Sequence, residues 1–372
     1  MLPNRLAPVE PPKNWRKFVL KIETARGSVS SAPDWLPILN RYRVPSQMRS
    51  AVELFVTAVP FVLLWIAAWA CLRWNYLLSL ALAVPAAGFL VRLFMIQHDC
   101  GHSAFFRWRL ANDWTGRIIG VLTLTPYDHW RRSHAVHHAS SGNLDRRGIG
   151  DVTTLTVGEY LAASRLQRVA YRLYRHPVVM FGLGPAYVFL VQHRYPAGEA
   201  LRRWRSWVSP MTTNAAIVAL LAIIGWLVGA RPLVLVHAPI VLLAASIGVW
   251  LFYVQHQFEE TFWARTGAWS MPQAALHGSS HYDLPPILRW FTANIGVHHV
   301  HHMCSRIPYY RLGRVLRDHP ELKDVGRITL PQSIRCVRFA LWDEERGRMI
   351  SFRQLRALQG AAEQRAKDTC RR

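Results

Sequence analysis

The sequence predicts an all-α, integral membrane fold with four transmembrane helices in two hairpins and a cytosolic helical cap that carries a histidine-rich metal site. Two observations lead to this prediction. Four apolar runs, each about 20 residues long, come in two closely spaced pairs, and this is the length that a helix needs to cross a bilayer. Three histidine clusters follow helical spacing, which places their imidazoles on one face of each helix.

The first pair of apolar runs covers residues 51–72 and 76–96, joined by Arg73-Trp74-Asn75. The second pair covers 214–230 and 233–254, joined by Arg231-Pro232. Because the links are so short, each pair predicts a helical hairpin. Residues 178–192 are also apolar, but the stretch is too short for a confident span. We interpret it as an interfacial or re-entrant segment.

This pattern divides the chain into three parts. Residues 1–50 form a basic cytosolic N-terminal segment, 51–319 form the membrane domain, and 320–372 form a basic cytosolic C-terminal tail. Five cysteines are scattered without close pairs. This arrangement excludes a disulfide framework and a CxxC zinc ribbon. The first fifty residues contain no short apolar stretch followed by a small-residue cleavage site, so we expect no signal peptide.

The distribution of basic residues predicts the orientation. The chain has 45 Lys and Arg against 22 Asp and Glu, a net charge of +23, and 42 of the 45 lie in the N-terminal segment, the central loop and the C-terminal region. Basic residues stay on the cytoplasmic side. We therefore expect a multi-pass protein of a bacterial inner membrane, with both termini and the histidine clusters in the cytoplasm. Nucleic-acid binding is disfavoured, because long apolar runs split the basic segments.

The histidines indicate a metal site. The clusters are His98-Asp-Cys-Gly-His102, His134-Ala-Val-His137-His138 and His298-His-Val-His301-His302, and His256 follows the fourth apolar run. Neutral imidazole is a good ligand for iron, zinc and copper. Eight clustered imidazoles exceed the needs of one ion and suit a dinuclear site. All three clusters fall on the predicted cytoplasmic side, where they can converge.

Other metal proteins fit less well. A zinc protease would carry HExxH, and a soluble-type di-iron protein would use Glu and ExxH motifs. A histidine-rich metal transporter or sensor is an alternative from another class. Transporters place ionisable groups inside their spans, whereas the apolar runs here are nearly free of them.

From about residue 90 to residue 318 the chain resembles the membrane fatty acid desaturases. The histidine motifs carry this resemblance, and three further segments are most similar to the acyl-lipid omega-6 (delta-12-like) branch: RRSHAVHHASSGNLDRRGIGD, WLFYVQHQFE and LHGSSHYDLPPILRWFTANIGVHHVHH. Related membrane hydroxylases, epoxygenases and carotenoid ketolases use similar histidine sets. A membrane di-iron hydroxylase or carotenoid-type oxygenase therefore stays open as an alternative.

The resemblance implies an oxidoreductase with two Fe ions that uses O2 to place a cis double bond in a membrane-lipid acyl chain. The iron ligands that it implies are His98, His102, His134, His137, His138, His298, His301 and His302, with His256 as the ninth. His299 is an extra histidine in the third cluster. A shifted ligand set that uses His299 breaks the helical spacing, so we favour His298.

Two further sets of residues are candidates for supporting roles. The candidates for orienting the ligand imidazoles are Asp99, Asp128, His129, Asp145, Asp151 and Asn294; those for docking a headgroup or an electron donor are Arg131, Arg132, Arg146 and Arg147. The sequence has no GxGxxG, HPGG or ferredoxin-type cysteine motif. We therefore expect a separate donor, a ferredoxin or a cytochrome b5-type protein, whose acidic surface would suit these basic residues.

Overall fold

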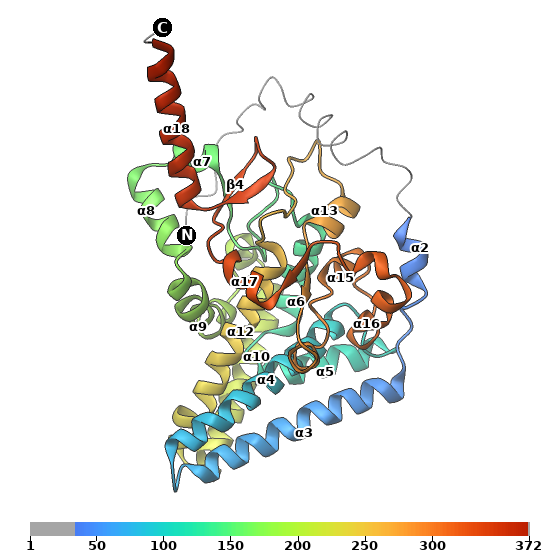
Figure 1. The fold of residues 1–372 in the computed structure, drawn as a ribbon. Helices are drawn as coiled ribbons and strands as arrows, with labels where there is room; N and C mark the ends of the chain where they lie inside the picture. Colours follow the sequence, from blue (N-terminus) through green and yellow to red (C-terminus); the bar gives the residue numbers. More distant parts are fainter. Residues whose placement is uncertain (1–33, 371–372) are drawn as a thin grey trace.

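The computed structural model describes residues 34–370, most of them helical (Figure 1). The first 33 residues of the predicted N-terminal segment lie outside the described residues. Four helical stretches are long and apolar enough to cross a membrane: α3 (Gln47–Cys71), α4 (Tyr76–Gly101), α10 (Trp204–Val228) and Ala230–His256, which comprises α11 (Ala230–Pro232), η4 (Leu233–His237) and α12 (Ala238–His256).

These stretches match the four predicted apolar runs, and two of them continue into polar residues beyond the run. α4 continues from residue 96 to Gly101, and α10 begins at Trp204 rather than at residue 214. Hydropathy marks the part of a helix that suits lipid, whereas the backbone hydrogen bonds continue through polar side chains. For α4 this extension carries His98 beyond the apolar run.

α4 is the central long helix. It packs along α3 after a short link and also contacts α12 and α5 (Arg109–Leu122) (Figure 1). In the most apolar part of α4 44% of the residues are buried, against 6% in the most apolar part of α10. The other residues of this part of α10 are partly or fully exposed, as expected of a helix that faces lipid. Ser46 and Asn75 cap α3 and α4 by accepting backbone N–H bonds.

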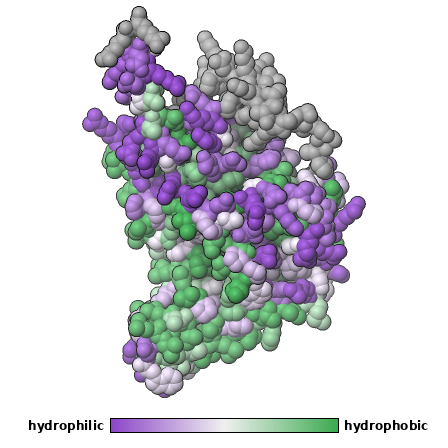
Figure 2. Space-filling view, viewed as in Figure 1, coloured by the Kyte–Doolittle hydropathy of each residue, from purple (hydrophilic) through white to green (hydrophobic). Residues whose placement is uncertain are grey.

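Shorter helices make up most of the rest of residues 34–370. Their bounds are α2 (Trp35–Asn40), α6 (Tyr127–Ser140), α7 (Val157–Ala162), α8 (Arg165–Tyr174), η1 (Val179–Leu183), α9 (Gly184–Leu190), η2 (Gln192–Arg194), η3 (Gly198–Arg202), α13 (Met271–His277), α14 (Pro286–Phe291), α15 (His298–Met303), α16 (Tyr309–Asp318), η5 (Pro320–Leu322), α17 (Leu330–Cys336) and α18 (Phe352–Cys370). The apolar stretch 178–192 thus forms η1 and α9. Figure 2 shows hydrophobic surface over the lower part of the molecule, where the long helices lie, and mostly hydrophilic surface above it.

Five short strands are absent from the all-helical prediction: β1 (Leu155–Thr156), β2 (His281–Asp283), β3 (Arg327–Thr329), β4 (Leu341–Asp343) and β5 (Arg348–Ile350). Strands of two or three residues are too short to show an alternating pattern. They form one sheet in the order β1-β4-β5 and a parallel pair, β2-β3. The pairings join the predicted C-terminal tail, 320–372, to the central loop and to the segment after α12.

Candidate metal centre

Four helices carry the clustered histidines. His98 lies in the last turn of α4 and His102 caps this helix. His134, His137 and His138 lie on α6, His256 is the last residue of α12, and His298, His301 and His302 lie on α15. Every residue of α15 is buried. The fold therefore collects side chains that are far apart in the sequence.

The nine histidines that the sequence singled out form two groups. His98, His102, His134, His138 and His301 make the first, and His137, His256, His298 and His302 make the second. Within each group one ring nitrogen from every residue lies within 4.8 Å of the others. α6 and α15 contribute to both groups, α4 contributes to the first and α12 to the second.

The Nε2 atoms of each group approach one another closely. In the first group, His134 Nε2 lies 3.0 Å from that of His98 and 3.1 Å from that of His138, which lies 3.2 Å from that of His301. His102 completes this group, with its ring centroid 4.7–4.9 Å from those of the other four.

The second group repeats this geometry. His256 Nε2 lies 3.2 Å from that of His137 and 3.0 Å from that of His298, and His298 Nε2 lies 3.1 Å from that of His302. An imidazole nitrogen carries either one proton or one lone pair. Chains of Nε2 atoms in mutual contact therefore cannot all be satisfied by hydrogen bonds among themselves.

The donor set fits metal cations. Burial lowers the pKa of five histidines on α6 and α15 well below the usual value, and the neighbouring imidazoles add to the effect. These five are His134, His138, His298, His301 and His302. Neutral rings keep the lone pairs that coordinate a metal. His102 Nε2 is buried without a hydrogen-bond partner among the described residues. A cation at each group would satisfy these nitrogens.

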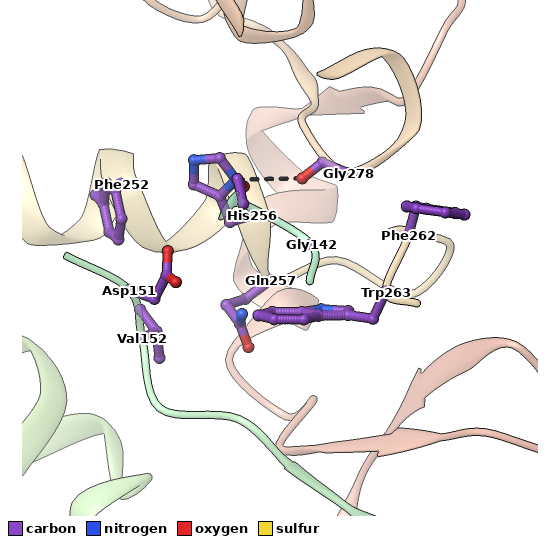
Figure 3. A pocket seen from close by; sticks show the side chains of 10 residues that line it. Gly142, Asp151, Val152, Phe252, His256, Gln257, Phe262, Trp263 and Gly278 are labelled. Atoms are coloured by element: carbon purple, nitrogen blue, oxygen red, sulfur yellow. Dashed lines mark hydrogen bonds between the residues drawn. The ribbon is translucent and has the colours of Figure 1, made fainter. Parts of the chain in front are cut away.

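Each group also has one carboxylate beside it. Asp151 Oδ1 lies 2.5 Å from His137 Nδ1, and Asp99 Oδ1 lies 3.4 Å from His98 Nδ1. A hydrogen bond at Nδ1 holds the proton there and leaves the lone pair on Nε2. His256 Nδ1 contacts the Gly278 carbonyl oxygen at 3.2 Å, which has the same effect (Figure 3).

A small pocket of about 10 Å³ adjoins the second group and is lined by Asp151, His256 and Trp263, among others (Figure 3). Asp151 Oδ2 and Trp263 Nε1 are buried without hydrogen-bond partners among the described residues. A space of this size is at the lower limit of what can hold one water molecule.

The other four candidates for an orienting role form no hydrogen bond with any of the nine histidines among the described residues. Asp128 pairs with Arg117, with Oδ2 3.0 Å from Nε, and Asp145 pairs with Arg265, with Oδ1 2.9 Å from Nη1. The Asn294 side chain donates to the Tyr309 carbonyl, and the backbone N–H of His129 donates to Ser209 Oγ. These contacts were not foreseeable, because each joins a candidate to a partner that no motif marks.

The candidate docking arginines differ in their surroundings. Arg131 Nη1 lies 2.7 Å from Asp113 Oδ1, and Arg147 forms an ion pair with Glu159. Arg132 and Arg146 are exposed. The exposed pair is therefore more available to a partner than the two paired arginines.

His299 lies apart from both groups. Its Nε2 bonds to the Leu322 carbonyl oxygen at 2.9 Å, and its ring centroid lies 5.8 Å from that of His281. Burial lowers the pKa of His299 to about 3. It is therefore a neutral core histidine whose ring contacts η5 and β2 rather than either group.

Two further residues that support the site were not singled out from the sequence. Trp130 stacks on the His134 ring at a centroid distance of 4.6 Å, one helical turn earlier on α6. The Tyr309 backbone N–H donates to Asp99 Oδ2 at 2.7 Å. Trp130 could have been found from the sequence, because residues four positions apart on a helix lie next to each other and Trp130 precedes His134 by four. Nothing in the sequence links Tyr309 to Asp99.

Comparison with known proteins gives a consistent result. The family described as fatty acid desaturase matches residues 73–329. A fatty acid desaturase of Bacillus subtilis (strain 168) is 49% identical over 312 residues, covering 84% of this chain and 88% of the relative.

More distant relatives match a smaller share. An sn-1 acyl-lipid omega-3 desaturase (ferredoxin) of a Synechocystis strain is 28% identical over 228 residues, covering 60% of this chain and 62% of the relative. A chloroplastic omega-6 fatty acid desaturase of Arabidopsis thaliana is 28% identical over 257 residues, covering 64% of this chain and 52% of the relative.

Proposed function

Because this chain belongs to the fatty acid desaturase family and is an oxidoreductase of that family, we propose that it places a cis double bond in the acyl chain of a membrane lipid, with delta-12/omega-6-like selectivity. The observation that carries the proposal is the convergence of nine imidazoles in two adjacent groups. In this proposal each group holds one iron, and the two irons supply the activation of O2 when they are bound.

This chemistry suits the donor set. A methylene group offers no handle for acid–base catalysis, so a redox cofactor must supply the oxidant. Removal of two hydrogens from the acyl chain, with two electrons from a donor and two protons, reduces O2 to two waters. The role of the protein is to hold the irons, orient the ligands and keep bulk water away. His137, His298 and His301 are at most 3% exposed, which serves the last of these roles.

We assign the ligand roles to the nine grouped histidines and an orienting role to Asp99 and Asp151. These two carboxylates contact ligand imidazoles, whereas Asp128 and Asp145 pair with arginines. Selection of one methylene among its neighbours would come from the shape of an apolar channel, because methylenes offer no hydrogen bonds.

The proposed placement in the membrane follows from charge. One arginine lies at each of the two links between the predicted apolar runs, Arg73 and Arg231, and 42 of the 45 basic residues lie outside these runs (51–72, 76–96, 214–230 and 233–254) and their links. Two hairpins with both links on the outer side put the histidine groups on the cytoplasmic side, in a cytosolic cap. The inner membrane of a bacterium is the corresponding location.

The electron donor in this proposal is a separate protein. A relative at 28% identity bears ferredoxin in its name, which favours a ferredoxin over a cytochrome b5-type donor. The exposed Arg132 and Arg146 are suited to an acidic protein surface.

Gas chromatography of fatty acid methyl esters tests the proposal. Cells that lack polyunsaturated lipids should gain an unsaturated acid when they express this chain. His137→Ala should abolish this product while the protein stays in the membrane, and His176→Ala, a change of an exposed histidine, should not. Equal unsaturation with and without His137 would overturn the ligand assignment. If the cells gained a hydroxylated acid instead of an unsaturated one, the protein would be a hydroxylase rather than a desaturase.

A further inference from the structure

A second site lies outside the histidine groups. A cavity of about 550 Å³ is bounded by β2, α14, the segment before α15, α16 and the start of β3. Its wall carries the basic residues Arg289, Arg317, Lys323 and Arg327 and the acidic residues Asp283 and Asp324. Basic residues therefore outnumber acidic ones.

Of the four basic residues in the wall, one forms an ion pair within the described residues and three do not. Arg327 is paired with Asp283, with Nη2 2.8 Å and Nε 3.1 Å from Oδ2. The side chains of Arg289, Arg317 and Lys323 form no ion pair or hydrogen bond with the part of the chain that the structure describes. Two guanidinium groups and one ammonium group are thus free to bind an anion, and a phosphate group suits the planar donors of arginine.

α14 places this cavity beside the membrane. Phe291 packs against Gly88, where an added Cβ would lie 2.9 Å from Phe291 Cδ1, and Trp290 meets Phe89 with ring centroids 5.7 Å apart. Gly88 and Phe89 lie in the second half of the apolar run 76–96 of α4, a candidate span, and Arg92, further along α4, donates to the Trp290 carbonyl. In the proposed orientation α14 therefore lies beside the cytoplasmic half of this span.

The exposed side chains of α14 agree with this position. Ile287 is 71% exposed, and Leu288 and Trp290 are each 40% exposed. These apolar groups suit the acyl region of the membrane, whereas Arg289 on the same helix lines the cavity. Interfacial segments commonly combine inserted apolar side chains with cations at the level of the lipid phosphates.

We propose that this cavity binds the phosphate group of an anionic phospholipid from the cytoplasmic leaflet, with Arg289, Arg317 and Lys323 as its ligands. The proposal rests on the membrane orientation proposed above, and it does not require that the bound lipid be the substrate. The site would fix the molecule against the leaflet from which acyl chains enter.

Native mass spectrometry of the full chain, released from nanodiscs that contain phosphatidylglycerol and phosphatidylcholine with identical acyl chains, tests the site. The wild-type protein should retain phosphatidylglycerol preferentially. Arg317→Gln/Lys323→Gln should lower this retention about tenfold or more, since each cation near an anionic lipid contributes about 1 kcal/mol. Arg353→Gln/Arg356→Gln on α18, where both residues are exposed, is the charge-matched control and should behave as wild type.

A second variant keeps every charge. A Cβ at Gly313 would lie 3.6 Å from Asn294 Oδ1 and 3.9 Å from Arg317 Nη1, which is ordinary contact. Gly313→Leu should therefore fold and fill part of the cavity, and it should also lower lipid retention.

Several results would overturn the proposal. Retention of phosphatidylglycerol that is equal in all variants would remove the site. Displacement of the lipid by millimolar inorganic phosphate would identify a site for the free anion. Unchanged lipid retention together with slower turnover from a ferredoxin donor would make the cavity a donor site. Lipid retention is measured without turnover, so a failure here is distinct from a failure of the desaturase proposal, which the methyl ester analysis reports.

Discussion

At the residue scale, the aspartates near the site are of two kinds: some contact a grouped histidine, and others form ion pairs with arginines. Asp151 accepts the Nδ1 proton of His137 at 2.5 Å, whereas Asp145, a few residues earlier, pairs with Arg265. We expect Asp151→Asn to lower iron occupancy or turnover about 10–100-fold, because a neutral amide is a weaker acceptor for the imidazole proton. Asp145→Asn is the matched control. Iron per chain and product per iron measure both, and equal losses in the two variants would contradict an orienting role for Asp151.

The adjacent residues His298 and His299 provide a sharper test at the same scale. His298 belongs to the second group, whereas His299 bonds to the Leu322 carbonyl. His298→Ala should release iron. His299→Ala should keep iron and lower the free energy of unfolding by about 1 kcal/mol or more, through a lost hydrogen bond and a cavity.

Metal analysis and thermal unfolding of the two variants separate these effects. Loss of iron in His299→Ala, with iron retained in His298→Ala, would reverse the assignment and support the shifted ligand set.

At the element scale, α6 is positioned through its first residue. Tyr127 packs against Gly116 of α5, and its hydroxyl donates to the Cys100 carbonyl at 2.9 Å. A Cβ at Gly116 would lie 2.2 Å from Tyr127 Cε2, so Gly116→Ala must displace Tyr127 and with it the three grouped histidines of α6, His134, His137 and His138. We expect the free energy of unfolding to fall by about 1–3 kcal/mol, together with iron content.

Gly248→Ala in α12 is the control for this change, because nothing lies within 4 Å of a Cβ at that position. Thermal unfolding and iron analysis should show little effect there. Full iron content in Gly116→Ala would mean that α6 adjusts without moving its histidines.

The elements also show how far the sequence could be interpreted. Hydropathy located all four long helices, because a run of apolar residues is a local signal. The short pairings of β1 with β4 and β2 with β3 join residues that are far apart in the chain. Such pairings depend on the packed structure and leave no periodic pattern in so few residues.

The same reasoning applies to the site. Helical spacing within each cluster marked the histidines that share a face, and the structure brings all nine of them into two groups. The division between groups was not foreseeable, because His137 and His138 are adjacent on α6 yet belong to different groups. Contacts such as Asp151 with His137 depend on how a loop returns to a helix, which spacing does not encode.

At the scale of the whole molecule, the proposed orientation predicts which surfaces labelling reagents can reach. The described cysteines Cys71, Cys100, Cys304 and Cys336 are buried, and Cys370→Ser removes the remaining thiol. In that background Trp74→Cys places a thiol at the first link, where Trp74 is 81% exposed. Gln364→Cys places one on the exposed surface of α18.

A membrane-impermeant maleimide should label Cys at position 74 in intact spheroplasts and position 364 after the membrane is opened. The physical reason is that basic residues remain on the cytoplasmic side, and α18 belongs to residues 255–372, which hold 18 of the 45 Lys and Arg. Cys370→Ser without an added cysteine is the control. Its four buried cysteines should stay unlabelled, and labelling of them would reveal unfolded or misinserted protein. The reverse pattern, with position 364 labelled in intact cells, would place the histidine groups on the outer side, away from cytoplasmic electron donors, and would require a different source of electrons.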